Sequence, residues 1–170
     1  NAGKFVASPR LLEQAADWLE SRIGKVERIR TRGPATAADQ ARELAERGAG
    51  LILVAGGDGT INEAINGLIT AIDAPPLAII PTGTANVLAA EIGLAARPAA
   101  IAAAIMDGAV RRVHLGRIET NGAVRRFSMM VGVGFDAWVV ARIDLRMKRL
   151  FGKGAYVATA LAQLWRGVNT

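Results

Sequence analysis

The sequence predicts an α/β fold, in which a doubly wound, mostly parallel sheet is followed by the start of an antiparallel, β-rich region. Over the first 110 residues, short apolar runs alternate with segments of helical periodicity, which is typical of βαβ units. Farther along, two apolar runs at residues 110–118 and 123–131 flank Asn121-Gly122, a strong signal for a β-hairpin. With 170 residues, 51% of them hydrophobic, the chain can close one substantial core but is short for two complete domains.

The first elements are marked by their end signals. A helix is predicted to begin at Pro9, because Ser8 can cap it, and to end at Gly24. A strand is expected over residues 26–29, and a second helix is expected to end at Gly48. The apolar stripes of the two helices consist of Leu12, Ala16, Leu19 and Ile23, and of Ala37, Ala41, Leu44 and Ala45.

Two buried strands come next, each followed by a helix. Residues 51–55 are five apolar residues in a row, and residues 77–80 form a similar run. Strands that are buried on both faces have this composition. The helices are expected over residues 60–69, over residues 84–92 and over residues 98–108.

A glycine-rich loop directly follows the first of these buried strands, where open α/β sheets bind ligands. Gly56, Gly57 and Gly59 can adopt positive φ and let a phosphate approach the backbone, while the next helix offers free N–H groups. Asp58 lies among them, and a carboxylate beside a phosphate suggests bound magnesium or a hydroxyl to be deprotonated. The spacing of Thr60 and Glu63 predicts a capping box at the start of that helix.

A second loop of the same kind follows the next buried strand. Residues 81–86, Pro-Thr-Gly-Thr-Ala-Asn, again join a strand to a helix through glycine, hydroxyl and amide side chains. An ordinary tight turn would explain the first loop alone, but two such loops at adjacent strand ends can clamp a polyphosphate from two sides. Neither loop matches the GxxxxGK[ST] or GxGxxG patterns.

The charge of the chain is unevenly distributed. Ten of the 21 basic residues lie within residues 111–153, against three acidic residues, so this segment carries about +7 where the whole chain carries +6. Such asymmetry suggests an anionic partner or a solvated basic face. Aromatic residues make up only 5% of the chain and no base-reading motif accompanies the charge, which argues against nucleic acid. The absence of cysteine excludes disulfides and thiolate chemistry and is consistent with a reducing cytoplasm.

Two segments together resemble the diacylglycerol kinase catalytic-domain family, which includes sphingosine and ceramide kinases and soluble bacterial lipid kinases. They are GGDGTINEAINGL at residues 56–68 and PLAIIPTGTANVLAAEIGL at residues 76–94. The resemblance implies an ATP-dependent lipid kinase that uses Mg²⁺ and transfers the γ-phosphoryl group to the hydroxyl of diacylglycerol or a related lipid. It also implies a cytoplasmic enzyme with possible peripheral contact at the inner, anionic membrane face.

The resemblance divides the chain into two parts. Residues 1–109 are expected to form the ATP-binding α/β domain, with its first strand missing, and residues 110–170 the beginning of an incomplete, β-rich lipid-binding domain. Asp58 is the candidate catalytic residue, while no metal ligand or oligomeric state can be assigned. The candidate nucleotide-binding residues are Thr31, Gly56, Gly57, Asp58, Gly59, Thr60, Glu63, Gly83, Thr84 and Asn86.

Other functions share part of this pattern. NAD kinases also use a GGDGT loop, but the loop at residues 81–86 resembles lipid kinases better and no Asn-Glu motif for a dinucleotide follows. Phosphofructokinases are a weaker match, because no sugar-phosphate site is recognisable. A regulatory module that holds a nucleotide without turning it over remains open at this point.

Overall fold

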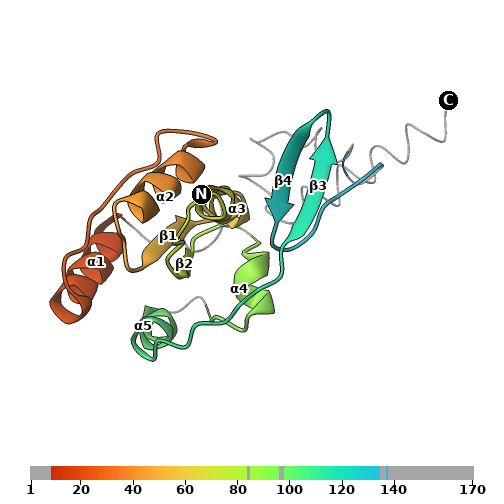
Figure 1. Ribbon diagram of the computed structural model, residues 1–170. Helices are drawn as coiled ribbons and strands as arrows, with labels where there is room; N and C mark the ends of the chain where they lie inside the picture. Colours follow the sequence, from red (N-terminus) through yellow and green to blue (C-terminus); the bar gives the residue numbers. More distant parts are fainter. Residues whose placement is uncertain (1–8, 84, 96–97, 135–136, 138–170) are drawn as a thin grey trace.

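A computed structural model describes residues 9–83, 85–95, 98–134 and 137 of the chain. Strands β1 (Ile52–Gly56) and β2 (Leu77–Pro81) pair in parallel, with Ile52 opposite Leu77. Strands β3 (Gly116–Thr120) and β4 (Ala123–Phe127) form a separate antiparallel hairpin, which lies beside α3 (Figure 1). The α/β class with a parallel sheet is therefore confirmed, whereas the division into two domains stays a prediction.

Helices lie on both faces of the parallel strands. One face carries Ile52 and Ile79, which pack in two apolar clusters with side chains of the second, third and fourth helices. Successive residues of a strand point to opposite faces, and Leu53 and Ile80 line a groove with residues of the first and fifth helices. The helices are α1 (Pro9–Ile23), α2 (Thr36–Glu46), α3 (Asp58–Leu68), α4 (Val87–Glu91) and α5 (Pro98–Met106).

The hairpin turn has the geometry that its residues predict. Asn121 and Gly122 both have positive φ, at 49° and 76°, as a two-residue type I′ connection requires. The strands themselves are shorter than expected, because residues 110–115 precede β3 without pairing. The expected pairing begins at Gly116, opposite Phe127.

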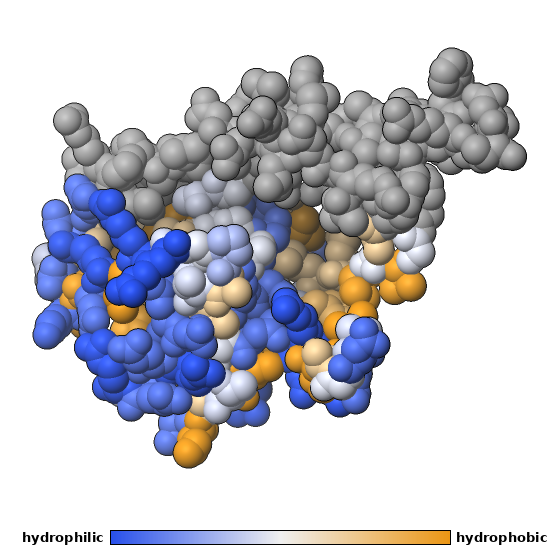
Figure 2. All heavy atoms as spheres, turned by 90° about the horizontal axis from the view of Figure 1, so that it is seen from above, coloured by the Kyte–Doolittle hydropathy of each residue, from blue (hydrophilic) through white to orange (hydrophobic). Residues whose placement is uncertain are grey.

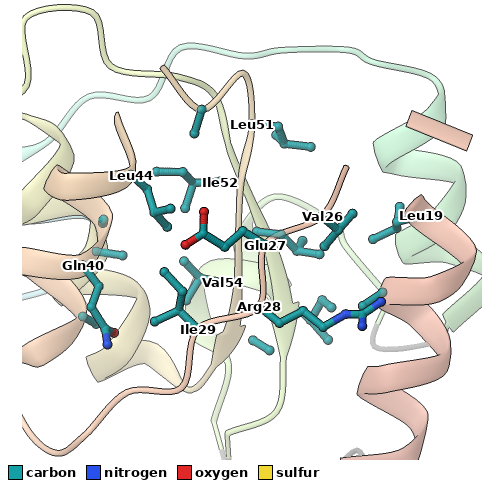
Figure 3. A pocket seen from close by; sticks show the side chains of 18 of the residues that line it. Leu19, Val26, Glu27, Arg28, Ile29, Gln40, Leu44, Leu51, Ile52 and Val54 are labelled. Atoms are coloured by element: carbon teal, nitrogen blue, oxygen red, sulfur yellow. The ribbon is translucent and has the colours of Figure 1, made fainter. Parts of the chain in front are cut away.

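The strand expected over residues 26–29 is not formed among the described residues. This segment is extended but joins no ladder, and Glu27 instead binds the guanidinium of Arg47 through both carboxylate oxygens, at 3.0 and 2.7 Å. That hydrogen bond and the charge of Glu27 raise the pKa of Arg47. A groove of about 1200 Å³ separates the segment from β1, with Val26, Ile29 and Val54 among its lining residues (Figure 3).

Helices α2 and α3 pack closely, and Gly67 is the residue that allows it. A Cβ atom at Gly67 would lie 2.0 Å from the backbone oxygen of Ala38 on α2. The surrounding contact is apolar and buried, with Ala41, Ala64 and Leu68 in one cluster. This contact sets the relation between the first turns of the two helices, which form the candidate site described below.

We expect Gly67→Ala to destabilise the protein by about 1–3 kcal/mol or more, because the added methyl group forces the two helix backbones apart. Gly59→Ala is the matched control in the same helix, since a Cβ there meets nothing within 4 Å. Alanine also favours the helix over glycine, by up to roughly 1 kcal/mol. Urea unfolding of both variants measures the difference. Equal stability of the two variants would contradict the packing of α2 against α3.

Within the described ranges, no helix combines the length and the apolar character that crossing a bilayer requires.

Helix α1 is only partly as predicted. Leu19 is buried, but Ile23 at the end of its stripe is 48% exposed. Ser8, the predicted cap of α1, lies outside the described residues.

Candidate nucleotide-binding site

The segment that leads into α2 and the first turns of α3 border one pocket of about 310 Å³. Each helix has 11 residues, so each carries the positive end of a helix dipole toward this region. Peptide N–H groups and dipoles at helix N-termini favour bound anions such as phosphate. The residues that line the pocket are Thr31, Gly33, Pro34, Gly59, Thr60 and Glu63.

The wall before α2 is held by Thr36, the first residue of that helix. Its hydroxyl donates to the backbone oxygen of Gly33 at 2.7 Å and accepts the N–H of Arg32 at 3.1 Å. Ala35, the residue directly before Thr36, has φ 65° in the left-handed region. Sequence reasoning missed Gly33, Pro34 and Thr36, although a Gly-Pro pair ahead of an apolar helical stripe is a turn signal that could have indicated them.

The opposite wall is the first turn of α3, which begins two residues earlier than expected. Ile61 donates to the backbone oxygen of Gly57 at 3.1 Å, so Gly57 is the N-cap. The N–H groups of Asp58, Gly59 and Thr60 therefore have no partner within the helix. The predicted capping box is wrong, because Thr60 already lies inside the helix, and Glu63 instead lines the pocket.

Gly56 and Gly57 of the first loop allow close packing, and no glycine of this loop has a left-handed backbone. None of Gly56, Gly57 and Gly59 has positive φ, so the expectation that they use this region is wrong. A Cβ at Gly56 would lie 2.7 Å from the Cβ of Thr60. A Cβ at Gly83 would lie 2.5 Å from the Cα of Gly57, so the two glycine loops touch backbone to backbone.

Polar side chains brace this contact between the loops. The amide of Asn86 closes the second loop, accepting from the N–H of Gly83 and donating to its carbonyl oxygen, both at 2.8 Å. Asp58 reaches across from the first loop, where its Oδ1 accepts the N–H of Leu88 at 3.4 Å. Helix α4 begins at Val87, three residues later than expected, because Asn86 has φ 51° and belongs to the loop.

The structure thus separates the predicted site residues into two neighbouring groups. Thr31, Gly59, Thr60 and Glu63 line the pocket between α2 and α3. Asp58, with the remaining glycines and Asn86, forms the contact between the two loops and does not line that pocket. Thr84 lies outside the described residues.

The carboxylates of this region fit a metal carried by a nucleotide better than a metal held by the protein alone. Among the described residues, no group of three or more acidic or histidine side chains is placed to hold a metal ion. Mg²⁺ in kinases is commonly bound by one or two carboxylates together with substrate phosphates. Asp58 is half-buried and only Oδ1 accepts a hydrogen bond among the described contacts, so its second oxygen is suited to that task.

Comparison with known proteins shows which family the chain belongs to. The family profile of the diacylglycerol kinase catalytic domain matches residues 1–118. The chain belongs to this family. It is similar to the diacylglycerol kinase of Mycobacterium tuberculosis, with 32% identity over 176 residues that cover 96% of this chain and 56% of the relative. The diacylglycerol kinase of Bacillus subtilis is 35% identical over 133 residues, covering 78% of this chain and 42% of that protein.

Solved structures of diacylglycerol kinases are also similar to this chain. A diacylglycerol kinase from Bacillus anthracis str. Sterne superimposes with a TM-score of 0.58 at 29% identity, covering 73% of this chain and 42% of that one. The chain therefore spans about half the length of the relatives that it matches. Family membership thus relates this chain to the catalytic domain of diacylglycerol kinases.

Proposed function

We propose that this protein transfers the γ-phosphoryl group of ATP to the hydroxyl of diacylglycerol or a related lipid. The observation that carries the proposal is the pocket shared by the N-terminal ends of α2 and α3, beside the two touching glycine loops. A polyphosphate needs N–H donors and positive dipole ends, and the site supplies both. Membership in the diacylglycerol kinase catalytic-domain family supports the choice of reaction.

In this proposal four residues of the site have distinct roles. The N–H groups of Gly59 and Thr60 donate to phosphate oxygens, and the hydroxyl of Thr31 adds a contact from the opposite wall. Asp58 holds magnesium or accepts the proton of the attacking hydroxyl. Magnesium bound with ATP would neutralise charge on the transferred phosphoryl group, as in other kinases. Catalysis in such a transfer consists chiefly of positioning and electrostatic stabilisation.

A phosphorylation assay with the full-length protein and labelled ATP tests this function. Diacylglycerol, sphingosine and total extracted lipid serve as acceptors, and NAD is the control acceptor because NAD kinases share the GGDGT loop. We expect transfer of label to a lipid only. Transfer to NAD would contradict the proposed substrate class, and ATP binding without transfer to any acceptor would favour a regulatory module.

Exposed arginines in the segment before β3 and on β4, called the basic surface below, provide the proposed contact with the membrane that contains the lipid. Arg111, Arg112 and Arg125 are exposed, and the neighbouring Val110 and Val113 are 69% and 56% exposed. Cationic side chains near an anionic membrane surface contribute about 1 kcal/mol each. We propose that this surface brings the enzyme into peripheral contact with anionic lipid.

We expect binding to anionic vesicles to fall as salt rises, because screening weakens exposed charges. Replacing Arg111, Arg112 and Arg125 together with glutamine should weaken binding by up to about 100-fold, given about 1 kcal/mol for each. Arg42→Gln on α2 is the control, since this exposed arginine pairs with Asp39 and lies on a different element. Vesicle sedimentation measures both. Equal binding to neutral and anionic vesicles would show that the basic surface is only solvated.

A further inference from the structure

Helix α3 holds the hairpin mainly through the side chain of Asn66, which makes two hydrogen bonds to β4. Its Oδ1 accepts the backbone N–H of Arg126 at 2.8 Å, and its Nδ2 donates to the backbone oxygen of the same residue, also at 2.8 Å. The amide thus bonds to β4 in the way that a neighbouring strand would. Asn66 and Arg126 are 60 positions apart in the sequence. Both partners are partly buried, so this pair of bonds is screened less than a contact on the surface.

A second asparagine, one helical turn earlier, completes the contact. Asn62 donates from Nδ2 to the oxygen of Arg126 at 3.2 Å, and its own backbone oxygen accepts from Nδ2 of Asn66 at 2.8 Å. Apolar residues on either side of the hairpin, Leu115 and Met129, pack against the cluster that contains Ile61 of α3. The hairpin is therefore docked on the same helix whose first turn forms the candidate nucleotide site.

This junction also contains buried polar groups without partners. Among the described residues, three buried side-chain atoms lack a hydrogen-bond partner, Asn62 Oδ1, Arg126 Nη1 and Ser128 Oγ, and the first two belong to residues of this junction. Buried polar groups without partners are costly. Removal of the Asn66 amide would leave the N–H and oxygen of Arg126 without these partners as well. A small displacement of β4 is therefore the expected response to that change.

We propose that Asn66 is a positioning residue of the kinase reaction, which fixes the hairpin relative to the first turn of α3. The helix is a rigid connection, since Asn66 follows Asp58 by eight residues, or about 12 Å of helical rise. The inference rests on the proposed function, in which the acceptor lipid must meet a phosphate held at that first turn. A misplacement of about 1 Å far from the reacting atoms can cost roughly 10² in rate.

Three substitutions separate positioning from mere packing. Asn66→Ala removes both hydrogen bonds that Asn66 makes to the backbone of Arg126. Asn62→Ala is the milder variant, because it removes only the longer bond that Asn62 itself makes to Arg126. Asn66→Asp keeps the size of the side chain but turns a carboxylate oxygen toward two backbone oxygens. Thr70→Ala, two residues beyond the end of the same helix, is the control, because its hydroxyl bonds only to Gly67 among the described contacts.

The test combines amide hydrogen exchange with steady-state kinetics of the full-length enzyme. We expect Asn66→Ala and Asn66→Asp to speed exchange over residues 123–127 but not over residues 52–56, and to lower kcat for lipid phosphorylation by about 10- to 100-fold. The KM for ATP should change less than about twofold, because the first turn of α3 is untouched. Asn62→Ala should change both readouts in the same direction by less, and Thr70→Ala should change neither.

Several outcomes would overturn the inference. Unchanged exchange over residues 123–127 in Asn66→Ala would show that the amide does not hold β4. Faster exchange with normal kcat in an active enzyme would show that the contact is only structural, as would wild-type behaviour of Asn66→Asp. If Asn66→Ala fails to fold, Asn62→Ala decides by the same two readouts. A wild-type enzyme that phosphorylates no lipid would contradict the proposed function, and the exchange result would still decide whether Asn66 positions β4.

Discussion

Gly57→Val is expected to abolish ATP binding while the protein still folds. Gly57 has φ −88° and ψ 179°, which valine can adopt, so the effect comes from contact and not from the backbone angles. A Cβ at this position would lie 3.1 Å from the Cα of Gly83, and the two methyl groups of valine would push the second loop away. Titration of ATP by calorimetry, with a thermal melt to verify folding, measures the loss.

Gly50→Val is the matched control for this prediction. Gly50 precedes the other end of β1, where a Cβ meets nothing within 4 Å, and its φ lies outside the positive range. We expect this variant to bind ATP with wild-type affinity. If folded Gly57→Val kept full ATP affinity, the contact between the two glycine loops would not be part of the ATP-binding site.

Asp58→Asn is expected to lower kcat much more than it raises the KM for ATP. The amide oxygen can still accept the N–H of Leu88, so α4 keeps its connection to the first loop while the negative charge is lost. A carboxylate that accepts the hydroxyl proton contributes typically about 10²–10⁴ in rate, and that contribution is made in the transition state. Steady-state rates of the full-length enzyme with diacylglycerol at saturating magnesium measure the effect.

The same substitution at Asp73 serves as the control. Asp73 is exposed and follows α3 at the end remote from the glycine loops, so Asp73→Asn should leave both kinetic constants unchanged. Near-normal kcat in Asp58→Asn would mean that this carboxylate only braces α4. The proton acceptor and metal ligands would then have to lie elsewhere in the protein.

Local sequence patterns were sufficient to predict the strands and the turn that are determined by neighbouring residues. The apolar runs at residues 51–55 and 77–80 predicted β1 and β2 to within one residue, and Asn121-Gly122 predicted its own turn. The start of α3 was misplaced because Thr60 and Glu63 have the spacing of a capping box, while the actual N-cap is Gly57 and no side chain caps the helix. A glycine N-cap offers no capping side chain that the sequence could show.

Contacts between distant segments explain the rest of what the sequence could not predict. The pocket depends on Gly33 and Pro34 meeting the first turn of α3, which follows from the close approach of α2 and α3 at Gly67. The hold of Asn66 on Arg126 joins residues 60 positions apart. Residues 26–29 have a strand-like pattern, but a strand requires a paired neighbour, and this segment is extended without one among the described residues.

The central claim is that a nucleotide binds between the N-terminal ends of α2 and α3. Amide hydrogen exchange of the full-length protein, with and without ATP and magnesium, tests it most directly, because bound phosphates protect the N–H groups that they contact. We predict slower exchange over residues 31–36 and 57–63, and unchanged exchange over α1. Protection confined to other segments, or none at saturating ATP, would contradict the claim.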